Sequence, residues 1–420
     1  MNKALTFTLI FFFVCSSFTI VFSYVSASDA AGDYWNTKTP MKQARSGLGV
    51  IAVDGKIYAI GGYGNGGWGI DAYVATNERY DPKTDTWTTL ASMPTRRSDF
   101  AIAAYEGKIY AIGGGTSGKN GLNDLLNVTE VYDIASNSWS TKAALPFNGK
   151  SLHANVVDGR IFVVGARDSF KYGSPQDLYV YDPVKALWTQ KTSMPRASPA
   201  GNFIVSAVVD DKIIFAGEFT IGNTDVAEQK VLIYDTKTDS WSEGKAGPTQ
   251  VWCGGAGATT GVYAPKNVYT LGITSNTVYD PIKNSWLSAK AMPTERANFG
   301  VAVVDDILYV IGGFTSTDFH AFGTPTEPSR LNEQYVPIGF HGTLPTTTSP
   351  VADSTPSDSV VSSESGSSDS VVSPQLEFES KSAPSMSFLI ESVGAIVVIT
   401  SCVVITTLFF LFKRTKKEVK

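Results

Sequence analysis

Three arginines occupy the same place in three copies of a repeated segment. Each follows a methionine by four residues, and that methionine follows a tryptophan by six; the three are Arg45, Arg97 and Arg296. A guanidinium group binds carboxylate or sulfate through two parallel hydrogen bonds. If the three segments stand next to one another around an axis, the arginines predict an anion-binding site at its mouth. The alternative is a structural role, in which each arginine bonds loop carbonyls or neighbouring carboxylates.

Aromatic residues supply a second kind of candidate contact. Trp68 lies among glycines, and Tyr172 and Trp252 lie in other segments that lack regular apolar alternation. Exposed aromatic rings stack on sugars or anchor partner proteins, although the same rings can instead pack their loops together. We therefore predict Arg45, Arg97, Arg296, Trp68, Trp252 and Tyr172 as ligand-binding residues.

Other chemical motifs are sparse. Asn127-Val128-Thr129 predicts N-glycosylation at Asn127. His153, His320 and His341 lack metal-ligand spacing, so neither a metal site nor a cofactor is predicted, and we assign no catalytic residue. No nucleophile turn of the Gly-x-Ser-x-Gly type and no phosphate-binding P-loop occurs.

Composition favours β-structure and excludes one class of partner. The 420 residues are 43% hydrophobic, 12% aromatic and only 17% charged, with 38 glycines, which indicates strands and tight turns rather than a helical bundle. Without the first 27 and last eight residues, 28 Lys and Arg face 38 Asp and Glu, a net charge of −10. Because this part of the chain has a net negative charge, we predict no nucleic-acid partner.

A tyrosine and a tryptophan seven residues apart form the core of the repeat. The complete pairs are Tyr80 and Trp87, Tyr132 and Trp139, Tyr181 and Trp188, Tyr234 and Trp241, and Tyr279 and Trp286. Trp35 has no such tyrosine before it, and Tyr335 has no such tryptophan after it. Positions i and i+7 of a tightly turned antiparallel hairpin face each other, so each pair is predicted to join two strands.

A second hairpin precedes each pair. Two apolar runs flank Asp54-Gly55, a strong hairpin-turn signal, and similar strand pairs recur along the chain, most weakly around 259–271. Each unit therefore has four predicted strands, termed a to d from the axis to the rim, and the chain contains six such units. The strand that carries Trp35 should complete the last unit beside Tyr335, because this closes the ring and removes exposed edges.

Paired glycines, Tyr-Asp and Trp at these spacings, with a period near fifty residues, resemble the kelch repeat of the galactose oxidase/kelch superfamily. The resemblance runs from Trp35 to about Gly339. It implies an all-β, six-bladed β-propeller over residues 33–342, with arginines at positions comparable to the three above lining a ligand pocket. Similarity to kelch proteins that resemble sugar mutarotases also makes Arg45, Arg97, Glu218 and His153 candidate acid–base residues. For a copper oxidase of the galactose oxidase type, Cys253 and Tyr263 form no recognisable constellation with the histidines.

Strand alternation assigns the connections to two faces. The a–b and c–d turns are short and uniform and belong to one face. The b–c loops on the other face are long and varied, spanning 63–76, 115–128, 166–177, 218–229 and 314–332. Variable loops on a rigid scaffold commonly carry binding sites.

The two ends of the chain predict attachment to a membrane. Residues 1–27 have the pattern of a signal peptide, residues 343–385 form a Ser/Thr/Pro-rich disordered stalk, and residues 388–412 form one transmembrane helix ahead of a basic cytoplasmic tail, 413–420. We thus expect a cell-membrane protein whose propeller lies outside the cell and binds an extracellular protein or glycan. The alternative is a membrane-tethered carbohydrate-active enzyme that uses the axial pocket.

Overall fold

A computed structural model describes residues 31–64, 72–117, 123–166, 176–195, 204–220, 227–247, 254–316 and 326–345. The predicted signal peptide, the stalk beyond residue 345, the transmembrane helix and the tail lie outside these ranges. In the ranges themselves, no helix has the length and apolar character that a membrane crossing requires.

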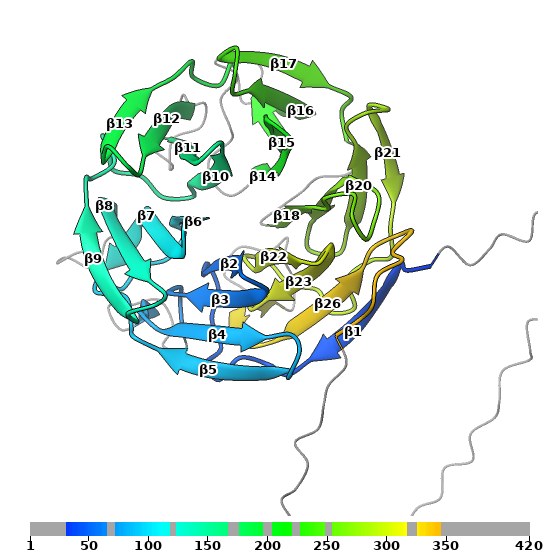
Figure 1. The fold of residues 1–420 in the computed structure, drawn as a ribbon. Helices are drawn as coiled ribbons and strands as arrows, with labels where there is room; N and C mark the ends of the chain where they lie inside the picture. The colour runs from blue at the N-terminus through cyan, green and yellow to red at the C-terminus, as the bar shows by residue number, and fades with distance from the viewer. Residues whose placement is uncertain are drawn as a thin grey trace, which may run out of the picture. The chain divides into compact units, whose positions relative to one another are not determined.

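Six four-stranded antiparallel sheets surround a central axis, with their first strands innermost (Figure 1). Blade one contains β2 (Gly49–Val53), β3 (Lys56–Ile60), β4 (Asn77–Asp81) and β5 (Thr86–Leu90); blade two contains β6 (Ala101–Tyr105), β7 (Lys108–Ser117), β8 (Asn123–Asp133) and β9 (Ser138–Lys142); blade three contains β10 (His153–Val157), β11 (Arg160–Ala166), β12 (Gln176–Asp182) and β13 (Leu187–Gln190). Blade four contains β14 (Ile204–Val209), β15 (Lys212–Thr220), β16 (Ala227–Asp235) and β17 (Ser240–Gly244); blade five contains β18 (Gly255–Ala258), β19 (Val268–Leu271), β20 (Asn276–Asp280) and β21 (Ser285–Ser288). The predicted all-β, six-bladed propeller is confirmed.

Blade six combines both ends of the folded part. Its strands are β22 (Gly300–Val304), β23 (Ile307–Ile311), β26 (Asn332–Val336) and β1 (Tyr34–Lys38), and β1 pairs with β26 so that Trp35 faces Tyr335. The predicted closure of the ring by the N-terminal strand is thereby confirmed. A small ribbon of β24 (Phe314–Ser316) and β25 (Thr326–Pro328) extends from the same blade.

The repeat tyrosine and tryptophan face each other across strands c and d in every blade. All six pairs are in register, and their ring centroids lie 4.9–5.2 Å apart. Each indole also donates a hydrogen bond to a backbone carbonyl that follows strand d of the preceding blade; Trp87, for example, donates to Thr39 at 2.8 Å. The pair therefore joins two strands of one blade and connects that blade to its neighbour.

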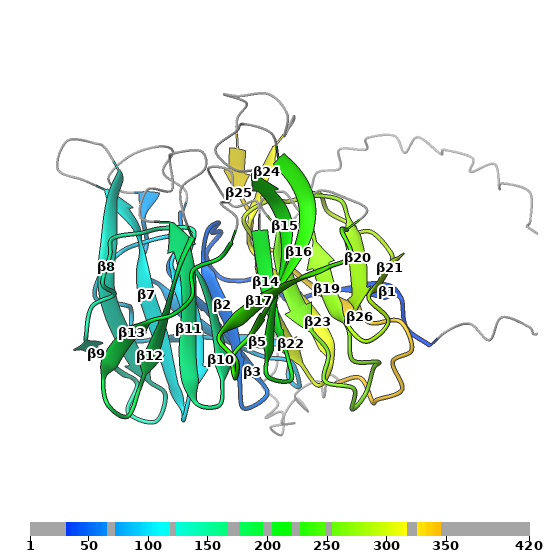
Figure 2. The same cartoon turned by 90° about the horizontal axis from the view of Figure 1, so that it is seen from above.

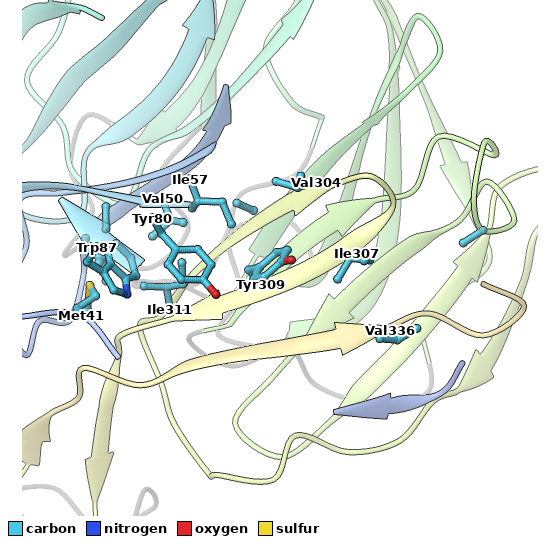
Figure 3. Close-up of a cluster of buried hydrophobic side chains, with 14 of the residues drawn as sticks. Met41, Val50, Ile57, Tyr80, Trp87, Val304, Ile307, Tyr309, Ile311 and Val336 are labelled. Carbon is cyan, nitrogen blue, oxygen red and sulfur yellow. The ribbon is translucent and has the colours of Figure 1, made fainter. Parts of the chain in front are cut away.

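Packing between blades forms the rest of the core. Figure 3 shows one such cluster, in which Val50, Ile57 and Tyr80 of blade one lie beside Tyr309 and Ile311 of blade six. All five side chains are buried. Because every sheet buries both faces against neighbours, the blades hold one another in place around the axis.

A carboxylate or amide at the position immediately before strand d adds a second bond between blades. Asp85 accepts hydrogen bonds from the Tyr80 hydroxyl of its own blade at 2.6 Å and from the Thr39 N–H of the preceding blade segment at 2.9 Å. The same double contact is made by Asn137, Asp239, Asn284 and Asp33. All five have positive φ, a conformation that Asp and Asn tolerate better than other side chains.

Blade three breaks this pattern, because Ala186 occupies the equivalent turn position at φ 53°. In the Ala186→Asn variant, the new amide oxygen should accept hydrogen bonds from the Tyr181 hydroxyl and the Ala143 N–H. Asparagine also tolerates the positive φ of this position. We expect the free energy of unfolding to rise by about 1–2 kcal/mol, measured by chemical denaturation. Ala186→Leu has a similar size but no acceptor and should give no gain. An Asn variant no more stable than the wild type would contradict the assignment.

The inner loop of blade five differs from its predicted form. The sequence placed a weak strand pair around 259–271, but the structure has β18 at 255–258, β19 at 268–271 and an extended loop between them. The buried Asp306 carboxylate accepts hydrogen bonds from the N–H groups of Thr260, Val262, Tyr263 and Ala264 in that loop. Burial alone raises the pKa of Asp306, but these backbone bonds outweigh it and lower the pKa below its usual value.

The described chain ends beside this same loop. After β26, the Phe340 side chain is buried near the ring of Tyr263, and the His341 N–H donates to the Tyr263 carbonyl at 2.8 Å. Residues 337–345 thus leave the propeller on the side that carries the a–b turns.

Candidate functional site

The two sides of the propeller differ in the connections that they carry. We call the side of the b–c loops and d–a connections the loop face, and the side of the a–b and c–d turns the turn face. Figure 2 shows β15, β16, β24 and β25 reaching the loop face, while the a–b turns lie at the opposite side. The paired strands extend as far as Ser117 and Asn123 in blade two, and Thr220 and Ala227 in blade four.

Arg45 lies in the interior of blade one, below the loop face. Its guanidinium is fully buried and donates to the carbonyls of Ala59, Gly61 and Thr76 at 3.0–3.2 Å. It also forms an ion pair with the buried Glu78 carboxylate at 2.7 Å. Gly61 and Thr76 flank the b–c loop of this blade, so one side chain holds both ends of the loop.

Arg97 and Arg296 repeat this arrangement in blades two and six. Arg97 donates to the carbonyls of Ala111, Gly113 and Val128 and pairs with Glu130 at 2.8 Å. Arg296 donates to the Gly312 and Leu331 carbonyls and pairs with Glu333 at 2.6 Å. Burial lowers the pKa of Arg97 to about 10, against the opposing effect of Glu130, so the guanidinium is charged at neutral pH.

These contacts correct the expected geometry of the three arginines. They do not meet at the axial mouth, since each lies inside its own blade with no exposed surface to offer a ligand. The structure places them in the alternative role, bonded to loop carbonyls and neighbouring carboxylates. As acid–base groups at the axis, Arg45 and Arg97 are likewise inaccessible.

The glutamates of these ion pairs were missed in the sequence, although a signal for them exists. Glu78, Glu130 and Glu333 each precede the repeat tyrosine by two residues. The other three blades have Tyr179, Leu232 and Thr277 there, and Gly149, Ser198 and Val251 in place of the arginine. Arginine and glutamate therefore occur together or not at all, as expected for a buried pair whose members need each other.

Backbone hydrogen bonds connect neighbouring blades in an arc around part of the axis, at residues that in blades six, one and two follow the arginines by two positions. The N–H of Gly47 donates to the Asn298 carbonyl, that of Asp99 to Gly47 and that of Ser151 to Asp99, all at 2.8–2.9 Å. The four residues share a positive φ of 50–59°. The starts of the inner strands of blades six, one, two and three are thereby fixed relative to one another.

A polar cluster lies next to this arc on the loop face. The Tyr63 and Tyr73 hydroxyls are 2.8 Å apart, and the Ser98 hydroxyl donates to the Asp99 carboxylate at 2.9 Å. Burial, then the charge of Asp99, raises the pKa of Tyr63, so its hydroxyl stays protonated. Burial lowers the pKa of Lys150, and Asp99 opposes that effect. Ser98 and Tyr73 are buried, whereas Tyr63, Asp99 and Lys150 are partly exposed, so a hydroxyl, a carboxylate and an ammonium are the groups of this cluster that could bond a polar partner.

Three of the remaining predicted residues lie outside the part of the chain that the structure describes. These are Trp68, Tyr172 and Trp252, and their ligand-binding role stays a prediction.

Asn127 is partly buried in β8, where the register shifts opposite Gly113, and its carbonyl accepts the Leu145 N–H. His153 begins β10, and burial lowers its pKa to about 4, so it is neutral at pH 7. No group of His, Cys, Asp and Glu suited to a metal ion occurs in the part that the structure describes.

Comparison with known proteins returns kelch proteins. A family model described as a kelch motif matches residues 44–94, 96–146 and 295–325, and each match contains one of the three buried arginines. The chain is 29% identical to Kelch-like protein 35 of Mus musculus, 30% to Beta-scruin of Limulus polyphemus and 24% to Kelch-like protein 36 of Bos taurus. These alignments cover 44%, 49% and 68% of this chain, but only 29%, 22% and 38% of the relatives.

The solved structure of YjhT shares the fold. It superposes with a TM-score of 0.55 at 18% identity, covering 70% of this chain and 95% of that chain. At this identity the likeness concerns the fold alone.

Proposed function

The chain is a six-bladed β-propeller with kelch motifs in blades one, two and six, and from this premise we propose that it is a recognition module that binds a protein or a glycan through its loop face. The observation that carries the proposal is the difference between the two faces. Loops with fixed ends and a hydroxyl-rich polar cluster lie on one face, and short turns lie on the other, apart from the extended a–b loop of blade five. A rigid scaffold with variable loops at one end is a common design for binding.

The last described residues, 337–345, lie against the blade-five loop on the turn face, and the predicted stalk follows them in the sequence. Together with the predicted signal peptide, stalk and transmembrane helix, the proposal is a single-pass cell-surface protein whose propeller lies outside the cell. The partner is then an extracellular protein or glycan.

Screening the full-length chain in detergent against arrays of extracellular proteins and glycans tests this proposal. Asp99→Asn keeps the positive-φ backbone but removes the charge from the polar cluster, and we expect it to weaken binding about tenfold or more. Trp68→Ala should weaken binding similarly if its ring contacts the ligand.

Asp54→Asn is the matched control, because Asp54 is an exposed a–b turn residue with φ 49° on the turn face. This variant should bind as the wild type does. Equal losses for Asp54→Asn and Asp99→Asn, or an array without a ligand, would argue against recognition through the loop face.

A further inference from the structure

We propose that the a–b loop of blade five, residues 259–267, and the exit segment, residues 337–345, form a latch that Asp306 holds closed. The latch opens as a unit while the ring of blades stays closed. It is also the first part of the propeller to yield when the chain beyond residue 345 is pulled. The latch does not depend on what the loop face binds.

Asp306 occupies a turn position at which the first three blades have glycine. The a–b turns of blades one, two and three end in Gly55, Gly107 and Gly159, all with positive φ. Asp306 has a φ of 61° at the same position and is buried, although two-residue turns of this kind favour glycine there. The turn itself needs no carboxylate, so the side chain must act on something outside the turn.

The Asp306 carboxylate of blade six fixes the loop of blade five. Its Oδ2 atom accepts hydrogen bonds from the N–H groups of Val262, Tyr263 and Ala264 at 2.7–3.1 Å, and Oδ1 accepts one from Thr260 at 2.5 Å. Because all four donors converge on one group, they lose their acceptor together when it is removed. Unpaired backbone N–H groups are costly to bury, so the loop then opens as a unit.

The loop in turn holds the exit segment. The Tyr263 carbonyl accepts the His341 N–H at 2.8 Å, and the buried Phe340 ring lies 6.4 Å from the Tyr263 ring. Phe340 and Ala264 belong to the hydrophobic cluster that blades six and one share, and Leu344 packs against the same cluster. Tyr263 and Ala264, whose N–H groups bond the carboxylate, therefore also contact the exit segment or share its core.

The order of contacts along the chain determines which of them a pull breaks first. A load applied beyond residue 345 reaches Leu344, His341 and Phe340 before it reaches β26. That strand is held more firmly, because it pairs with β23 on one side and with β1 on the other. The Asp33 N–H adds a bond to the Val336 carbonyl at 2.8 Å. The latch is therefore expected to release before the ring.

Replacing Asp306 by glycine in the full chain tests the latch. Glycine suits this turn, as it does in blades one to three, so loss of the carboxylate is the main change. Hydrogen exchange followed by mass spectrometry should show peptides covering 260–264 and 340–343 exchanging about tenfold faster or more, with 34–38 of β1 still protected. Asp305→Gly is the matched control, because Asp305 has a φ of 50° but an exposed side chain, and it should change neither peptide.

Wild-type exchange of both peptides in Asp306→Gly would refute the latch. Faster exchange of 260–264 alone would show that the loop does not hold the exit segment, and loss of protection in 34–38 would show that the ring opens with it. Either result overturns the proposal. Should Asp306→Gly fail to fold, Asp306→Asn gives the same test, because it keeps the size of the side chain but removes its charge and one acceptor oxygen.

Single-molecule pulling on the full chain in detergent tests the mechanical order. One handle is placed at the C-terminus and the other at Lys185, an exposed residue of blade three. The wild type should lengthen in a first step of at most about 30 Å, the extended length of residues 337–345, before the ring unfolds. In Asp306→Gly this step should need less force while the ring unfolds at an unchanged force. Traces without the first step, or an equal fall in both forces, would contradict the load-bearing role.

Discussion

Deletion of residues 35–41 should abolish the cooperative unfolding transition of the propeller. The deletion removes most of β1, the outer strand of blade six, together with the Trp35 ring, which lies 5.0 Å from Tyr335 and donates to the Lys290 carbonyl. It also removes Met41, which is buried between blades one and six. Loss of one large buried side chain costs about 2–5 kcal/mol, so the combined loss is comparable to the about 5–15 kcal/mol that stabilises a typical domain.

Differential scanning calorimetry of the full chain measures this effect directly. A chain lacking residues 356–362, which removes the same number of residues from the predicted stalk, serves as the control and should melt like the wild type. An unchanged melting transition after deletion of 35–41 would show that the ring does not depend on its N-terminal strand.

The second large effect is expected from Arg45→Leu. The change leaves the Glu78 carboxylate buried without its cation and removes the donor from three carbonyls. Removing one partner of a buried ion pair typically costs about 3–5 kcal/mol, and we expect a loss of this size in the free energy of unfolding from urea denaturation.

The double variant Arg45→Leu/Glu78→Leu should recover a large part of that loss, because no unpaired charge remains. Arg330→Leu, at an exposed arginine, should change stability by less than about 0.5 kcal/mol. A loss below about 1 kcal/mol for Arg45→Leu, or a double variant as unstable as the single one, would contradict the structural role of the pair.

The blades could be predicted from the sequence because their determinants are local and repeated. A seven-residue spacing between Tyr80 and Trp87 fixes the register of two strands, and Asp54-Gly55 fixes the hairpin before them. The unpaired Trp35 and Tyr335 identified the closing strand, because each lacked the partner that the other supplies. Such features depend on few residues and occur several times, so one weak copy does not obscure them.

The role of the arginines could not be derived in the same way. Whether Arg97 points toward the axis or into its blade depends on where Glu130 and three carbonyls lie after folding. The shared occurrence of Arg and Glu was visible in the repeats, but its meaning required knowing that the two positions meet inside the blade. Likewise, the bond network of Asp306 has no counterpart among the described residues of the other blades, so no repeat could indicate it.

The loops carry the least predictable part of the site. Trp68, Tyr172 and Trp252 were selected for their chemical type, and no repeated spacing constrains them. Tyr63, Tyr73 and Lys150 are brought together with Asp99 by three different connections of the loop face. Contacts of this kind arise only from the assembled ring.

Hydrogen exchange of the full chain with and without its ligand tests the central claim most directly. The account predicts slower exchange on binding at the described ends of the loop-face connections, namely 114–117, 123–129 and the residues around Tyr63, Tyr73 and Phe314. The a–b and c–d turns, such as 54–55 and 82–85, should exchange at the same rate in both states. Protection confined to those turns would place the partner on the turn face and contradict the account.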